Sequence, residues 1–152
     1  MGSRAVASME LSDARVGAMI EKPLRVGVDL AGSLEPMGDT MNELAVSLRD
    51  RGNMLVPFTT ARGRHRITPQ RTFTQPFTQM WRRGTGPAVD RLLPRVDVIH
   101  VAGRQVPPTH QTPLVVSVDD LRPLLDDEST TRASQLQKAV DRGAILVATS
   151  YA

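Results

Sequence analysis

The sequence has no cysteine, few aromatic residues (three Phe, one Trp and one Tyr), and no long apolar run. The lack of cysteine excludes disulfides and thiolate metal sites and is typical of a reducing compartment. No run approaches the roughly 18 apolar residues that a membrane-spanning helix needs. The first twenty residues carry charges and no apolar core, which argues against a signal peptide. We therefore expect a cytoplasmic location.

A chain of 152 residues suits one domain that buries a substantial core. Residues 1–23 are small, polar and weakly patterned, and Pro23 separates them from the rest of the chain. They are predicted to form a disordered or weakly helical leader. Residues 24–152 are predicted to form a single, partial Rossmann-like domain.

Five apolar runs predict strands. Val96–Ala102 and Leu114–Val118 are almost continuously apolar and rich in β-branched residues, which is typical of strands covered by helices on both faces. The other three predicted strands are Leu24–Leu30, Asn53–Thr59 and Ala144–Thr149. Pro57 indicates that its strand lies at an edge of the sheet or ends there.

Segments with apolar residues at helical spacing separate these strands. The predicted helices run from Asp39 or Thr40 to about Arg51, from Pro76 to Gly84, from Pro87 to Pro94, and from Ser129 or Thr130 to Gly143. Strands that alternate with helices predict an α/β, three-layer sandwich with a mainly parallel sheet and right-handed crossovers.

The candidate site lies where the predicted strands end. In an open parallel sheet, ligands bind in the crevice beyond the carboxyl ends of the strands. His100–Arg104 follow one central strand, Asp119–Arg122 follow the other, and Gly38 lies in the loop after the first strand. The predicted substrate-binding residues are Gly38, His100, Asp119 and Asp120. No residue is predicted to be catalytic.

The glycine loop and the acidic pair also have ordinary structural explanations. Gly32 and Gly38 precede a helix N-terminus, which suits a phosphate, but neither GxGxxG nor GxxxxGK[ST] is present. An ordinary turn is therefore favoured over a phosphate site. Asp119 and Asp120 could form a metal pair or an acid–base pair. However, adjacent side chains of an extended backbone point apart, which favours simple loop residues.

His100 lies inside an apolar run, where a histidine is more often a satisfied strand residue than a catalytic one. His65 and His110 lie in predicted loops and share no metal-ligand spacing with it. We expect no zinc site, no other metal and no cofactor.

Residues 61–94 are rich in arginine with interleaved aromatic residues. The first-ranked interpretation is a solvated surface with its aromatics turned into the core. The second is an anionic membrane surface bound by Trp81, Arg82 and Arg83, which would make the protein peripheral at the inner face of the membrane. The third is nucleic acid, held through its phosphates and by base stacking.

Several segments follow one another in an order typical of a known family. LRVGVDLAGSLEPMGDTMNELAVSLRDRG is a strand, a glycine-containing loop and a helix. DVIH, Pro107-Pro108, PLVVSVDDLRPL and the final AVDRGAILVATS come later. In this order, from Leu24 to Ser150, they resemble the N-terminal domain of family 4 (group 1) GT-B glycosyltransferases.

The resemblance implies an acceptor-side domain of a retaining transferase, which moves a sugar from a nucleotide-sugar donor to a sugar or lipid acceptor. The family carries His-Asp after the second central strand. Here Asp119 stands at the histidine position, and only Asp120 matches. The family's second domain, which holds most of the donor, lies outside these residues. The domain is therefore expected to be incomplete at its C-terminus, inactive alone, and prone to self-association through an uncovered sheet edge.

Two other function classes stay open on the sequence alone. The first is a non-catalytic α/β binding module that keeps the sheet without the donor-binding half. The second is a basic nucleic-acid-binding domain built on residues 61–95, which ranks last among the partners considered.

Overall fold

The computed structural model describes residues 22–31, 38–61, 65–102, 105–118 and 130–148. Almost all of the predicted leader, residues 1–23, therefore lies outside the described residues. The same holds for Asp119 and Asp120, two of the four predicted substrate-binding residues.

The described strands form one six-stranded sheet in which every pairing is parallel. They are β1 (Arg25–Asp29), β2 (Met54–Thr59), β3 (Arg71–Thr72), β4 (Val98–Ala102), β5 (Leu114–Val118) and β6 (Ile145–Ala148). Their order across the sheet is β3-β2-β1-β4-β5-β6. The direction of winding reverses between β1 and β4, as in doubly wound Rossmann-like folds. The predicted α/β class and mainly parallel sheet are confirmed.

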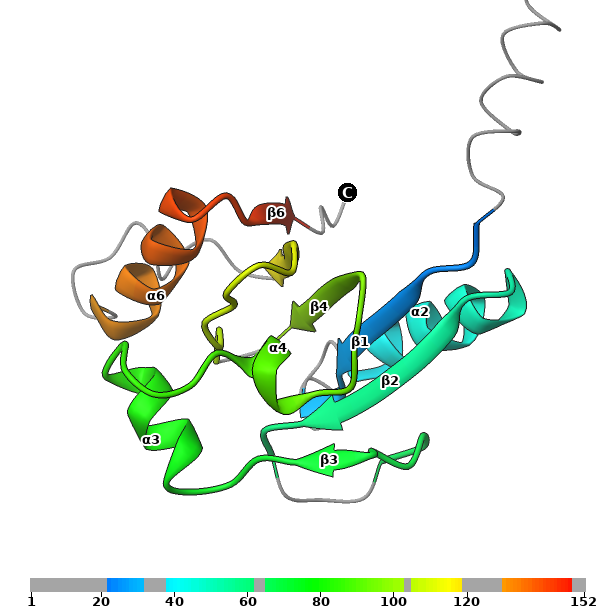
Figure 1. Ribbon diagram of the computed structural model, residues 1–152, viewed down its shortest axis with the longest axis horizontal. Coiled ribbons are helices and arrows are strands. Elements are labelled where there is room, and N and C mark those ends of the chain that lie inside the picture. Colours follow the sequence, from blue (N-terminus) through cyan, green and yellow to red (C-terminus); the bar gives the residue numbers. More distant parts are fainter. Residues whose placement is uncertain (1–21, 32–37, 62–64, 103–104, 119–129, 149–152) are drawn as a thin grey trace, which may run out of the picture.

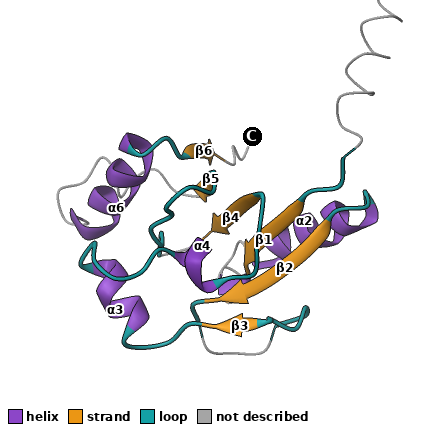
Figure 2. Ribbon diagram, viewed as in Figure 1, coloured by secondary structure: helices purple, strands orange, loops and turns teal. Residues whose placement is uncertain are grey.

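Four helices of the described residues lie against this sheet (Figures 1 and 2). They are α2 (Gly38–Asp50), α3 (Phe77–Arg82), α4 (Val89–Leu92) and α6 (Thr130–Asp141). On one face, Val26 and Val28 of β1 pack in one buried cluster with Met41 and Ala45 of α2. The helix begins at Gly38, so that Asp39 and Thr40, predicted as caps, lie inside its first turn instead. Such one- or two-residue shifts are ordinary at helix ends.

The other three helices share the opposite face of the sheet. Ile99 of β4 and Val116 of β5 belong to a second buried cluster that contains Trp81 of α3, Val89 of α4 and Leu136 of α6. Side chains alternate between the faces of a strand, so the nearly continuous apolar character of β4 lets it supply both clusters, with Val98 and Ala102 on one face and Ile99 and Val101 on the other. Helix, sheet and helix therefore form the three layers that the sequence predicts.

Strand β3 is the one element that the sequence pattern does not predict. It has only two residues, both exposed, and it pairs with Phe58 and Thr59 at the end of β2. Just before this pairing, the Gln70 N–H donates to the Pro57 carbonyl at 2.7 Å. The carbonyl and the N–H of one strand residue point to the same neighbouring strand. Since the Pro57 carbonyl points to the β3 side, the N–H that proline lacks would also have pointed there and not to β1. Pro57 thus lies near the sheet edge, as predicted, and costs the β1–β2 ladder nothing.

All three phenylalanines and the one tryptophan meet in a single cluster. Phe73 lies at its centre, with ring centroids 5.4 Å from Trp81, 5.9 Å from Phe77 and 6.0 Å from Phe58. Three of the four ring pairs are edge-to-face, the favourable geometry for aromatic rings. This cluster holds α3 and the segment after β3 against β2. The first-ranked interpretation of the arginine-rich segment, with its aromatics turned inward, is confirmed for Phe73 and Trp81.

Asp90 ties α4 to the connection between β4 and β5. Its carboxylate accepts the backbone N–H groups of His110, Gln111 and Thr112 at 2.9–3.1 Å. Partial burial alone would raise the pKa of Asp90, but these donors outweigh it and hold the pKa below its usual value. A carboxyl whose pKa is lower in the folded state stabilises the fold at neutral pH, and this contribution is lost as the pH falls through the folded pKa.

We predict that Asp90→Asn destabilises the domain by about 1–2 kcal/mol at pH 7, because the amide loses one acceptor oxygen and the charge. The difference from wild type should shrink at lower pH, where Asp90 itself becomes neutral. Urea unfolding at a series of pH values measures this, with the exposed Asp50→Asn as the matched control. An unchanged midpoint at pH 7 would show that the 110–112 connection does not depend on the carboxylate.

Strand β6 exposes apolar side chains at the end of the sheet. Ile145 is 61% exposed and Val147 43% exposed, and β5 is the strand that pairs with β6 within the described residues. An apolar edge strand of this kind is a template for pairing with a second chain.

The expected self-association can therefore be tested at β6. Val147→Lys should lower the associated fraction in sedimentation velocity, because charge on an edge strand opposes strand pairing. Val46→Lys, at an exposed apolar position of α2, is the control. Wild-type protein that stays monomeric at every concentration would contradict the expectation.

Candidate functional site

The crevice beyond the carboxyl ends of β1 and β4 is the site that the fold selects. The two strands are neighbours, with Val26 opposite Val98 and Val28 opposite His100. In a doubly wound sheet ligands bind beyond the carboxyl ends of the strands at such a reversal, so this edge is the candidate site. The described residues place two groups of polar side chains near it. One surrounds Asp29, and the other joins β4 to β5.

His100 and Ser117 form the polar pair on β4 and β5. His100 Nε2 lies 2.7 Å from Ser117 Oγ, on the face of the sheet that carries α2. Burial lowers the pKa of His100, so the imidazole is neutral at pH 7. Which atom of the pair donates depends on the tautomer. Among the described residues no carboxylate hydrogen-bonds to this imidazole, so the pair has no third group of a Ser-His-Asp triad there.

This pairing satisfies a histidine inside an apolar strand, as its sequence context indicates. The half-buried imidazole keeps hydrogen-bonding capacity for a hydroxyl group of a ligand. A hydroxyl and a neutral imidazole on neighbouring strands suit polar, uncharged ligands such as sugars. Sequence reasoning missed Ser117, whose only signal is a small polar residue inside the run LVVSV.

Asp29, at the end of β1, is a second residue that the sequence patterns did not single out. It is 1% exposed, and its Oδ1 accepts the Ala31 N–H at 2.8 Å while the Thr60 hydroxyl lies 3.4 Å from Oδ2. These bonds join the segment after β1 to the segment after β2. Its only sequence signal is an acidic residue at the end of the strand LRVGVDL, directly after the apolar residues Val26–Val28.

Burial raises the pKa of Asp29 from 3.8 to about 7, against the lowering effect of its hydrogen bonds to Ala31 and Thr60. A carboxyl with a pKa near 7 is suited to exchange protons, and buried groups of this kind concentrate at functional sites. The raised pKa also opposes folding. As the pH rises, Asp29 loses its proton near pH 4 in the unfolded chain but only near pH 7 in the folded one. The free energy of unfolding is therefore not reduced by Asp29 below pH 4, and it falls between pH 4 and about pH 7.

We predict that Asp29→Asn becomes increasingly more stable than wild type between pH 4 and pH 7, with no further gain above. A shift of about three pKa units sets an upper bound on the order of 4 kcal/mol for this gain. Urea midpoints at matched pH values give the difference. Asp97→Asn is the control, because Asp97 also accepts a backbone N–H, from Arg25 at 2.8 Å, but is exposed. A difference that does not change with pH would show that Asp29 is ionised throughout.

The structure places Gly38 at the first residue of α2, after the connection that follows β1. Of the predicted binding residues, His100 contacts Ser117, and Gly38 begins the helix that follows β1 in the chain. Asp119 and Asp120, predicted for the same crevice, directly follow β5 and lie outside the described residues. Within the described ranges, no three His, Asp or Glu side chains are grouped closely enough to bind one metal ion.

The predicted surface patch of Trp81, Arg82 and Arg83 needs a correction. Trp81 is 1% exposed, and its indole N–H donates to the Pro87 carbonyl at 2.9 Å, so this side chain belongs to the core and not to a membrane-facing surface. Arg82 and Arg83 are exposed. The buried rings of Phe73 and Trp81 also leave no surface on which nucleic-acid bases could stack at these positions. None of the described helices has the length and apolar character to cross a membrane.

Comparisons with protein-family models, with curated proteins and with solved structures found no match to this chain.

Proposed function

We propose that this chain is the acceptor-side domain, or part of it, of a retaining GT-B glycosyltransferase. The acceptor would be a sugar or a lipid, and a second domain would hold the nucleotide-sugar donor. The proposal takes its family from the order of segments between Leu24 and Ser150. The observation that carries it is the reversal of strand order between β1 and β4, with polar side chains near the carboxyl ends.

His100 and Ser117 are proposed to bind a hydroxyl group of the acceptor. The lowered pKa of His100 keeps the imidazole neutral. A neutral imidazole can donate or accept a hydrogen bond and does not favour an anionic ligand over a neutral one. Asp29 is proposed as a positioning residue, because its bonds to Ala31 and Thr60 fix the backbone that leads into the loop before α2.

Sugar transfer gains most of its rate from holding the two reactants in attack geometry and from stabilising charge on the leaving phosphate. An acceptor-side domain supplies the first part only. We therefore propose that this chain alone does not transfer sugar. Arg82 and Arg83, both exposed, would approach an anionic membrane if the acceptor were a lipid.

Binding of neutral saccharides tests the acceptor site. We predict that saturation-transfer NMR detects binding of glucose, mannose or a neutral disaccharide at millimolar concentrations, and that His100→Ala and Ser117→Ala weaken it. The expected loss is about fivefold to tenfold, as for one hydrogen bond to a bound hydroxyl. His110→Ala is the control, because His110 is an exposed histidine in the connection between β4 and β5.

Two results would contradict the proposal. One is the absence of binding by every saccharide, or binding that His110→Ala weakens as much as His100→Ala does. The other is nucleotide release by the isolated chain from UDP- or GDP-sugars in the presence of an acceptor, which would make it a complete catalyst.

A further inference from the structure

An open cleft of about 800 Å³ lies at the opposite edge of the sheet from the proposed acceptor site. Its walls are the turn after α3, the connection that leads into β5, and the last turns of α6 with the start of β6. Leu114 and Ala144 line it at the amino ends of β5 and β6, whereas Asp29 and Ser117 lie near carboxyl ends. A volume of this size is typical of small-molecule sites.

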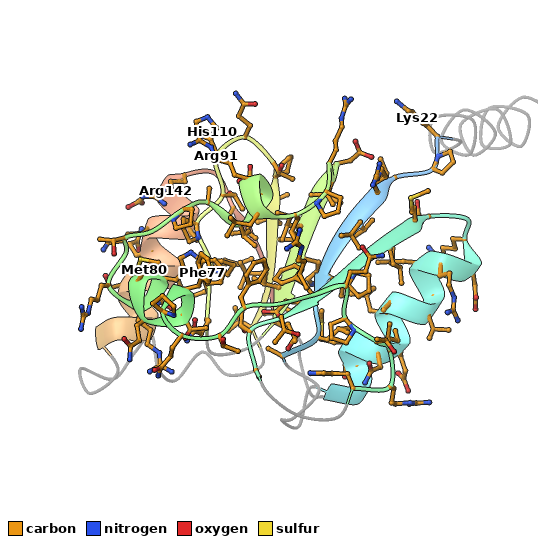
Figure 3. The ribbon with its side chains drawn as sticks, turned by 60° about the horizontal axis from the view of Figure 1, so that its bottom comes forward. Lys22, Phe77, Met80, Arg91, His110 and Arg142 are labelled. Carbon is orange, nitrogen blue, oxygen red and sulfur yellow. The ribbon has the colours of Figure 1, made fainter. Side chains whose placement is uncertain are left out.

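The charged side chains that line the cleft are all basic. Arg91 comes from α4, and Lys138 and Arg142 come from the end of α6. The imidazole of His110, in the connection before β5, also lines the cleft. Figure 3 shows Arg91, His110 and Arg142 gathered at one end of the molecule. The described residues that line the cleft include no Asp or Glu. A concave surface lined by one sign of charge concentrates ions of the other sign.

The negative charge near the cleft is smaller than the charge of its three cations. Asp90 adjoins Arg91 in sequence, but its carboxylate faces the backbone N–H groups of His110, Gln111 and Thr112, and Asp90 is not among the residues that line the cleft. The carbonyl end of α6 carries roughly half an elementary negative charge, which Lys138 and Arg142 offset. Arg91 belongs to a different helix and does not offset the charge at the end of α6. Three cations from two helices therefore line one cleft, which favours an anion as the ligand.

Two further features shape the inner part of the cleft. Gly84 adopts a φ of +73°, and a Cβ added there would lie 3.0 Å from Lys138 Nζ, so the lysine side chain reaches across to the turn after α3. Gln135 is 8% exposed and donates from Nε2 to the Trp81 carbonyl at 3.3 Å. Its Oε1 has no hydrogen-bond partner among the described residues. This oxygen is shielded from solvent, so the amide shapes the inner wall of the cleft and offers no exposed acceptor there.

The geometry points to a binding site for the phosphate group of a phosphomonoester, either a small soluble molecule or a lipid headgroup. Arg91, Lys138 and Arg142 hold the phosphate through charge-assisted hydrogen bonds. Gln135 lines the inner part of the cleft. This site is independent of the proposed transferase function, because it shares no residue with the acceptor crevice.

The cleft contains its own reporter. Trp81 is the only tryptophan of the chain and lines the cleft. Binding therefore changes a fluorescence signal that comes from this site alone. Titration at constant ionic strength with inorganic phosphate and with glycerol 3-phosphate is expected to give saturable changes. Vesicles of phosphatidic acid in phosphatidylcholine, compared with phosphatidylcholine alone, test the headgroup.

Substitutions connect the signal to the cations. Arg142→Ala and Lys138→Ala should each weaken glycerol 3-phosphate binding about tenfold, as expected for one hydrogen bond between charged groups. Both side chains are exposed, so thermal unfolding should change little. Arg91→Ala is a further variant from a separate helix. Arg49→Ala is the control, because it removes the same charge from the exposed surface of α2 on the other face.

The results of these titrations distinguish the two ligand sources. Cleft-dependent binding of glycerol 3-phosphate supports a soluble ligand, and cleft-dependent binding of phosphatidic acid vesicles alone supports a headgroup. Both outcomes retain the phosphate site. No saturable change with any probe would overturn the inference. So would an effect of Arg49→Ala equal to that of the cleft variants, because binding would then follow net charge.

Discussion

The parallel pairing of β1 with β4, covered by helices on both faces, is the constraint on which the rest of the structure depends. It joins two distant parts of the chain and requires both strands to be apolar on both faces. Because every described strand pairing is parallel, each connection leaves the sheet at its carboxyl edge and returns at its amino edge. The proposed acceptor site lies at the carboxyl edge, and the cleft lies beside the connections that enter β5 and β6 at the amino edge.

The two edges differ in their chemistry. Near the carboxyl edge, the described polar groups are paired with one another, as His100 is with Ser117 and Asp29 with Thr60, and His100 is held neutral by burial. At the amino edge, three cations surround an open cleft in which they face no lining carboxylate among the described residues. The first environment suits hydroxyl groups, and the second suits a phosphate. Asp90 and the aromatic cluster around Phe73 hold the walls of the cleft in place.

Most of the fold could be predicted from the sequence, because continuous apolar runs and glycine or proline boundaries mark the elements locally. Strand β3 could not be predicted, because its two polar residues have no strand pattern of their own. They pair with β2 because the tertiary fold brings them beside it. For Trp81 the sequence favours burial but leaves a membrane-facing surface as the second interpretation, because a six-residue helix has too little periodicity to decide between the two. Asp29 is concealed by the apolar run around it. Arg91, Lys138 and Arg142 each resemble ordinary surface charges, and only the tertiary fold brings them to one cleft.

The central claim is that the two edges of one sheet bind two kinds of ligand independently. Amide chemical shifts of the 15N-labelled protein test it directly, with glycerol 3-phosphate and a neutral disaccharide added separately and together. We expect the phosphate to shift amides around Pro107–Leu114 and Gln135–Ala144, and the sugar to shift those near Asp29, His100 and Ser117, without interference between the two. Shifts of one shared set of amides, or of neither set, would contradict it.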